Sequence, residues 1–143
     1  MAENILNVKA NTDNLNEVTA FVDAFLEEHG CPMKVQMQID IAVEEIFVNI
    51  ANYAYEAEGG DAEIRIGMGK PDASEGGREV FITFIDSGIP YDPLAKPDPD
   101  ITLSAEDRPI GGLGIYMVKK SMSSVSYERK EDKNILTISK IIG

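Results

Sequence analysis

Residues 45–53 read Glu-Ile-Phe-Val-Asn-Ile-Ala-Asn-Tyr, a mostly apolar run that contains one carboxylate and two carboxamides. Glu45 and Asn49 are four residues apart, and at about 3.6 residues per turn this spacing stacks them on one side of a helix. A buried polar group without a partner costs about 1–3 kcal/mol. Two such groups beside the core face of a helix therefore indicate a ligand site along its border.

The helix predicted around this stretch runs from about Met33 to Glu56. Its apolar side chains recur at helical spacing and form one broad stripe, made of Ile39, Ala42, Val43, Ile46, Phe47, Ile50 and Ala54. The other predicted elements are a strand over 5–8, a helix ending near Glu28, strands over 64–68 and 80–85, a helix over 112–122, and a hairpin of 125–129 with 135–141.

This order of elements predicts the fold class. Strands that follow one another through short turns favour an antiparallel or mixed sheet. With three helices on one face, the expected fold is α+β, a two-layer α/β sandwich with a mixed, mostly antiparallel sheet. The length of 143 residues predicts a single domain over 1–143. The segment 92–109 carries four prolines among acidic residues and is expected to be a mobile loop or lid.

Charge and composition exclude several classes of function. The net charge is −12, from 25 acidic and 13 basic residues, and this repels phosphate backbones, so nucleic acid is not expected as a direct partner. A single cysteine excludes an intrachain disulfide framework. The first residues lack the basic start and apolar stretch of a signal peptide, and no run is long enough to span a membrane. The expected location is the cytoplasm.

Two further segments suggest that the ligand is a nucleotide. Asp86 ends the strongest predicted strand, where a carboxylate accepts a hydrogen bond from the exocyclic amine of adenine, and Gly88 leaves room for a flat base. The run 111–114, Gly-Gly-Leu-Gly, precedes a predicted helix, and a helix N-terminus favours anions such as phosphate. Taken alone, the first segment also fits an ordinary turn and the second a flexible helix start.

The pair on the long helix adds a chemical role. The amide oxygen of Asn49 is a suitable ligand for Mg²⁺, whose shell is completed by waters and phosphate oxygens. Glu45, one turn away, is placed to deprotonate or orient an attacking hydroxyl. An exposed acid beside a surface asparagine is the plainer interpretation of the pair alone. The order and separation of all three segments favour the nucleotide site.

The three segments together resemble the ATP-binding fold of the GHKL superfamily, the Bergerat-type fold of gyrase, the heat-shock chaperone, sensor histidine kinases and mismatch-repair ATPases. Within it, the run 42–49, Ala-Val-Glu-Glu-Ile-Phe-Val-Asn, is most similar to the bacterial anti-sigma-factor serine kinases. The resemblance implies that Glu45 is the catalytic base, that Asn49 binds Mg²⁺, and that ATP is bound by Asn49, Asn52, Tyr53, Asp86, Gly88, Gly111, Gly112, Leu113 and Gly114.

The resemblance also implies partners. Such proteins bind and silence a sigma factor, and they phosphorylate a serine or threonine of a small anti-anti-sigma antagonist; many are homodimers. The alternative is a non-catalytic ATP-binding module that changes partners with nucleotide state. The chain departs from the family at Tyr53, where relatives often carry histidine, near Glu17, where they carry arginine, and at Lys133-Asn134, where they carry Gly-Thr. The last change leaves a second adenine contact open.

Overall fold

The computed structural model describes residues 3–55, 59–69, 78–95 and 113–143. Its strands and α-helices, with two short 3₁₀ helices η1 and η2, are β1 (Asn4–Lys9), η1 (Thr12–Asn14), α1 (Leu15–Glu28), α2 (Met33–Tyr53), β2 (Asp61–Met68), β3 (Glu79–Asp86), η2 (Pro93–Ala95), α3 (Leu113–Ser121), β4 (Ser124–Lys130) and β5 (Lys133–Ile141).

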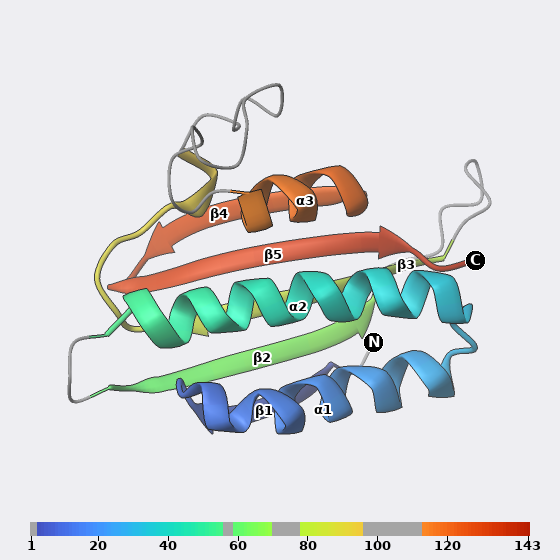
Figure 1. The fold of residues 1–143 in the computed structure, drawn as a ribbon, viewed down its shortest axis with the longest axis horizontal. Helices are drawn as coiled ribbons and strands as arrows, with labels where there is room; N and C mark the ends of the chain where they lie inside the picture. The colour runs from blue at the N-terminus through green and yellow to red at the C-terminus, as the bar shows by residue number, and fades with distance from the viewer. Residues whose placement is uncertain (1–2, 56–58, 70–77, 96–112) are drawn as a thin grey trace.

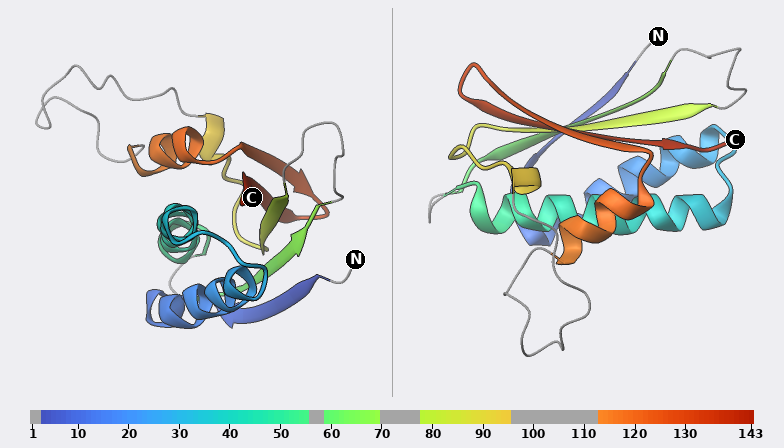
Figure 2. Two further views of the ribbon diagram at one scale, coloured as in Figure 1. Left: turned by 90° about the vertical axis from the view of Figure 1, so that its right-hand side faces the viewer. Right: turned by 90° about the horizontal axis from the view of Figure 1, so that it is seen from above.

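The strands form one five-stranded sheet in the order β1-β2-β3-β5-β4. Helices α1, α2 and α3 lie on one face of it, with α2 between the other two (Figure 1), and the two turned views show the helices together on one side of a twisted sheet (Figure 2). The predicted two-layer α+β sandwich is confirmed. Every strand pairing among the described residues is antiparallel, so the sheet there is not mixed.

The core lies between the helices and the inner face of the sheet. The stripe predicted on α2 is buried, and Ile39, Val43 and Phe47 are completely so. Opposite it, Ile64 and Ile66 of β2 are fully buried, because alternate side chains of a strand point to one face. This packing holds α2 firmly across the sheet and fixes the direction of its polar border.

Two element boundaries differ from the predicted ones. Strand β2 begins at Asp61 rather than at residue 64, because Asp61, Ala62 and Glu63 pair with β1 although these residue types rarely favour strands. Helix α2 ends at Tyr53, and the carbonyl of the next residue, Ala54, accepts a hydrogen bond from the backbone N–H of Ile89. The predicted end at Glu56 lies outside the described residues.

Two carboxyl groups meet between α1 and α2. Asp23 and Asp40 each have a buried Oδ1 that finds no hydrogen-bond partner in the described part of the chain. Burial raises the pKa of Asp40 to about 7, and the hydrogen bond and negative charge of Asp23, together with the charge of Glu27, add to the rise. Asp40 therefore holds its proton in the folded protein at pH values where the unfolded chain has released it.

We expect Asp40→Asn to stabilise the protein at pH 8 but not at pH 5. Between the ordinary aspartate pKa of 3.8 and about 7, the folded state binds more protons, so the free energy of unfolding falls as the pH rises. An asparagine amide donates to Asp23 at every pH. After allowing for solvent screening, we expect the free energy of unfolding of Asp40→Asn at pH 8 to exceed that of the wild type by about 1 kcal/mol. Thermal melts at both pH values measure the difference.

Glu44→Gln is the matched control, because Glu44 is exposed on the same helix. Glu44→Gln should change the free energy of unfolding by the same small amount at pH 5 and at pH 8. If the difference in stability between Asp40→Asn and the wild type does not change with pH, Asp40 does not hold a proton in the folded protein at neutral pH.

Candidate functional site

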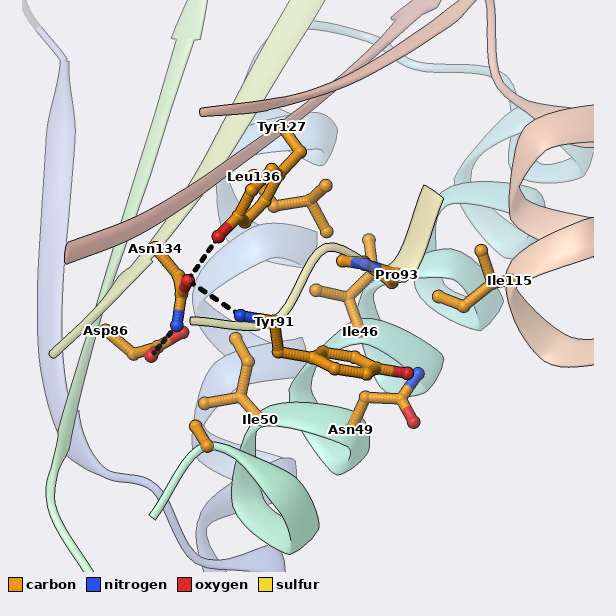
Figure 3. Close-up of a pocket in the computed structure, with 11 residues that line it drawn as sticks. Ile46, Asn49, Ile50, Asp86, Tyr91, Pro93, Ile115, Tyr127, Asn134 and Leu136 are labelled. Carbon is orange, nitrogen blue, oxygen red and sulfur yellow. Dashed lines mark hydrogen bonds between the residues drawn. The ribbon is translucent and has the colours of Figure 1, made fainter. Parts of the chain in front are cut away.

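Two of the predicted segments, through Asn49 and Asp86, line one small cavity, and Ile115 brings α3 to it. It lies between the C-terminal half of α2, the end of β3, the start of β5 and the N-terminal part of α3 (Figure 3), and it is lined by Ile46, Asn49, Ile50, Ala54, Asp86, Tyr91, Pro93, Ile115, Tyr127, Asn134 and Leu136. Its volume is about 30 Å³, which corresponds to about one or two water molecules. Polar groups stand at both ends of an otherwise apolar space.

Asp86 lies at the inner end of the cavity and is only 5% exposed. Its Oδ1 accepts hydrogen bonds from the backbone N–H of Gly88 and from Nδ2 of Asn134, both at 2.9 Å. Both of these bonds use the same oxygen. A buried carboxylate that is hydrogen-bonded through one oxygen and lines a mostly apolar cavity suits recognition of an amine on a ring.

Gly88 has a steric role that the sequence did not indicate. A Cβ atom at this position would lie 2.1 Å from the carbonyl oxygen of Ala54, at the point where Ile89 donates to that same oxygen. The loop after β3 therefore packs directly on the backbone at the end of α2. The room predicted for a base at Gly88 is taken up by this contact.

We expect Gly88→Ala to lower the free energy of unfolding by about 1–3 kcal/mol, because the clash is with backbone that is itself hydrogen-bonded. Urea unfolding followed by circular dichroism measures the change. Gly67→Ala is the control, since a Cβ there would approach only the flexible side chain of Glu3, at 3.2 Å. If both variants lower the free energy of unfolding equally, the contact with Ala54 does not constrain residue 88.

Glu45 and Asn49 lie together on the border of α2, as their spacing predicts. Asn49 Nδ2 lies 3.5 Å from Glu45 Oε1, a long hydrogen bond. Glu45 also faces the first turn of α3, because a Cβ built at Gly114 would come within 1.9 Å of Oε1. Any side chain at residue 114 would displace this carboxylate, so the glycine lets the start of α3 approach Glu45 closely.

Two other predicted ATP-binding residues, Asn52 and Tyr53, do not line this cavity. Asn52 lines a separate hollow with Asn11, Thr12 and Tyr55. Tyr53 is 58% exposed, and its ring centroid is 6.4 Å from that of Tyr91. Leu113 begins α3. Gly111 and Gly112, with most of the predicted lid, lie outside the described residues.

Sequence reasoning missed three residues that the structure places at this site. Asn134 is buried at the start of β5, and Tyr127 donates to it from β4. Tyr55, just after α2, donates to the carbonyl of Asp61 and accepts from the N–H of Ser87, so it ties the helix end to β2 and to the loop after β3. Burial raises its pKa. The signal in the sequence was that Lys133-Asn134 stand where relatives carry Gly-Thr, which left a second adenine contact open without indicating the role of Asn134.

Comparison with known proteins identifies the family. A family model described as the histidine kinase-like ATPase domain matches residues 8–140. The chain belongs to the histidine kinase-like ATPase family. This finding confirms the GHKL resemblance drawn from the three segments.

One relative of this histidine kinase-like ATPase domain is named a kinase. The serine/threonine-protein kinase BtrW of Bordetella bronchiseptica is 27% identical over 105 residues, which cover 73% of this chain and 70% of that protein. The fold matches the crystal structure of the RsbU and RsbW domains of a Mycobacterium tuberculosis protein with a TM-score of 0.65 at 15% identity. That match covers 99% of this chain, which spans only 33% of the mycobacterial one.

A second solved structure with this fold is the SiaB–SiaC complex of Pseudomonas aeruginosa. The TM-score is 0.57 at 14% identity, and the match covers 97% of this chain and 89% of the other. These two likenesses establish the shared fold. Among the described residues of the histidine kinase-like domain, no helix is long and apolar enough to cross a membrane.

The residues of this histidine kinase-like ATPase domain fit ATP and Mg²⁺ in their chemistry. Asp86 supplies a buried acceptor, Asn49 an amide oxygen, and the first turn of α3 faces Glu45. No cluster of three or more His, Cys, Asp or Glu side chains suited to a metal occurs in the described residues. Mg²⁺ usually keeps several waters and is held by few protein groups together with substrate phosphates, so the amide oxygen of Asn49 fits such a role without a cluster of acidic ligands.

The size of the cavity sets a condition on binding. Tyr91 points across α2 toward Asn49, and Pro93 follows it on the same side of the cavity (Figure 3). A purine ring system is much larger than the volume they leave. We therefore expect the side chains of Tyr91 and Pro93 to shift when a purine binds in this cavity.

Proposed function

We propose that this chain is an ATP-dependent serine/threonine protein kinase that acts as an anti-sigma regulatory factor in the cytoplasm. It would bind a sigma factor and phosphorylate a small anti-anti-sigma antagonist protein. One observation carries the kinase assignment: the Glu45 carboxylate lies against the start of α3 and beside Asn49, and Asn49 lines the same cavity as the buried Asp86.

The distribution of groups divides the site into two ends. At the inner end, Asp86 would accept a hydrogen bond from the exocyclic amine of adenine, with Ile50 and Ile46 against the ring. At the outer end, Asn49 would hold Mg²⁺, and backbone N–H groups at the start of α3 would face the phosphates. In this proposal, Mg²⁺ and these N–H groups contribute to neutralising the charge of the phosphates.

Glu45 would supply the chemical step. ATP and Mg²⁺ together provide an electrophilic γ-phosphorus. Glu45 takes the proton of a serine or threonine hydroxyl of the partner, the hydroxyl oxygen forms a bond to that phosphorus, and the bond to the bridging oxygen of ADP breaks. ADP and the phosphorylated partner are released.

The relatives support the choice of acceptor and partner. The Bordetella protein is named a serine/threonine-protein kinase, and the Pseudomonas protein was solved as a complex with a second protein. A protein hydroxyl is therefore the proposed acceptor. The sigma-factor role rests on the similarity of residues 42–49 to the anti-sigma kinases.

Incubation with γ-labelled ATP and small candidate antagonists from the same genome tests the proposal. Label transferred to a serine or threonine of one of them, dependent on Mg²⁺, is the expected result. ATP binding without transfer to any candidate would favour the non-catalytic module that changes partners with nucleotide state. Pull-downs with ATP and then ADP present identify the sigma factor and show whether its binding follows the nucleotide.

A further inference from the structure

Asn134 occupies a buried position directly opposite Asp86. The two residues are paired in the register of β3 and β5, and Asn134 is only 6% exposed. The family that the sequence resembles often has Gly-Thr at this point of the chain. The role of Asn134 in this protein is therefore inferred from the contacts of its own side chain.

The side-chain amide of Asn134 is fully hydrogen-bonded. Nδ2 donates to Asp86 Oδ1 at 2.9 Å and to the carbonyl of Ile89 at 2.8 Å. Oδ1 accepts from the hydroxyl of Tyr127 at 2.5 Å and from the backbone N–H of Tyr91 at 3.3 Å. The carbonyl of Ile89 can only accept and the N–H of Tyr91 can only donate, so these partners fix which end of the amide is nitrogen.

This arrangement leaves Asn134 no donor for a nucleotide base. Its effect is on Asp86 instead, because its Nδ2 and the N–H of Gly88 both bond to Oδ1. Two donors on one oxygen fix the rotation of the carboxylate and therefore the direction of Oδ2. The same amide holds the backbone of Ile89 and Tyr91, the segment that closes the cavity (Figure 3).

We propose that Asn134 is a positioning residue for adenine recognition. It holds the Asp86 carboxylate so that Oδ2 meets the exocyclic amine of the base, and it links this carboxylate to the segment that carries Tyr91. The inference rests on the proposed ATP site, and it explains how this chain manages without the Gly-Thr of its relatives.

The test compares Asn134→Ala and Asn134→Asp with the wild type by calorimetric titration of Mg²⁺-ATP. Both variants should bind ATP at least about tenfold more weakly at pH 8, since a hydrogen bond to a charged group is lost. In Asn134→Asp, two carboxylates face each other at Asp86, which raises the pKa of the pair. As the pH falls to 6, a shared proton restores a donor to Asp86, and the affinity relative to wild type should partly recover.

The alanine variant should show no such recovery, and it keeps the test valid if Asn134→Asp does not fold at pH 8. Inosine triphosphate, which lacks the amine, gives a second readout: both variants should lose affinity for ATP but not for this analogue. Asn7→Ala is the control, because Asn7 is an exposed asparagine of β1 that does not line the cavity, and it should bind ATP as the wild type does.

Two results would overturn the inference. If the wild type binds ATP and both variants bind it within twofold of wild type, Asn134 does not position Asp86, although the proposed function stands. If the variants lose as much affinity for inosine triphosphate as for ATP, and the ATP affinity of Asn134→Asp does not recover at pH 6, Asn134 has only a general structural role. A wild type that does not bind ATP would overturn the proposed function together with this inference.

Discussion

Glu45→Gln is expected to slow phosphoryl transfer to a protein hydroxyl by about 100- to 10,000-fold, the usual contribution of a positioned general base. Glutamine has nearly the same shape, so it keeps its place beside Asn49 and against the start of α3. It has no basic oxygen that could take the hydroxyl proton. Affinity for Mg²⁺-ATP should stay close to that of the wild type, because Asp86 and Asn49 are unchanged.

Single-turnover transfer from γ-labelled ATP measures the rate, and calorimetric titration measures the affinity. The neighbouring Glu44→Gln is the matched control, since Glu44 is exposed on the same helix and should transfer phosphate at the wild-type rate. Transfer by Glu45→Gln at a rate close to wild type would rule out Glu45 as the base. It would leave the nucleotide site itself in place.

Asp86→Asn is expected to weaken ATP binding by about 100-fold or more, from a lost charge-assisted hydrogen bond and an unpaired polar group. The amide oxygen of the new asparagine can accept from Gly88 and Asn134 as Oδ1 does now. Its NH₂ group must then take the place of Oδ2 and would point at the amine of adenine. Two donors would face each other, while the fold keeps its internal bonds.

Calorimetry with ATP and a thermal melt of the same sample separate these two effects. Asp61→Asn serves as the control, because Asp61 is exposed at the start of β2 and pairs only with Lys9 among the described residues. Its ATP affinity should not change. Unchanged affinity in Asp86→Asn would refute the adenine assignment, and a large fall in melting temperature would point to a structural role for the carboxylate.

Much of the fold could be predicted from local patterns. The spacing of apolar residues on α2 predicted both its buried stripe and the polar border with Glu45 and Asn49, because helical periodicity depends only on residues close in sequence. Alternation of apolar and polar residues predicted the strand over 64–68, and a nearly continuous apolar run predicted β3. Pairing with β1, which extends β2 back to Asp61, depends on a strand more than fifty residues away, and single-sequence patterns carry no information about it.

The site was predicted less completely for the same reason. Glu45, Asn49 and Asp86 belong to local motifs, and the structure brings all three to one region. Asn134 is important through its partners on β3, β4 and the loop after β3, which no local window contains. Asn52 shares the helix border with Asn49, but the structure places it in a separate hollow.

The closed position of Tyr91 has a kinetic consequence. In the proposed ATP site, the cavity behind Tyr91 is narrow, so we expect a nucleotide to bind the conformations in which this side chain has moved aside. The measured dissociation constant would then equal the intrinsic one divided by the fraction of molecules in those conformations. Association should become independent of nucleotide concentration once that movement limits it, and stopped-flow mixing with ATP measures this.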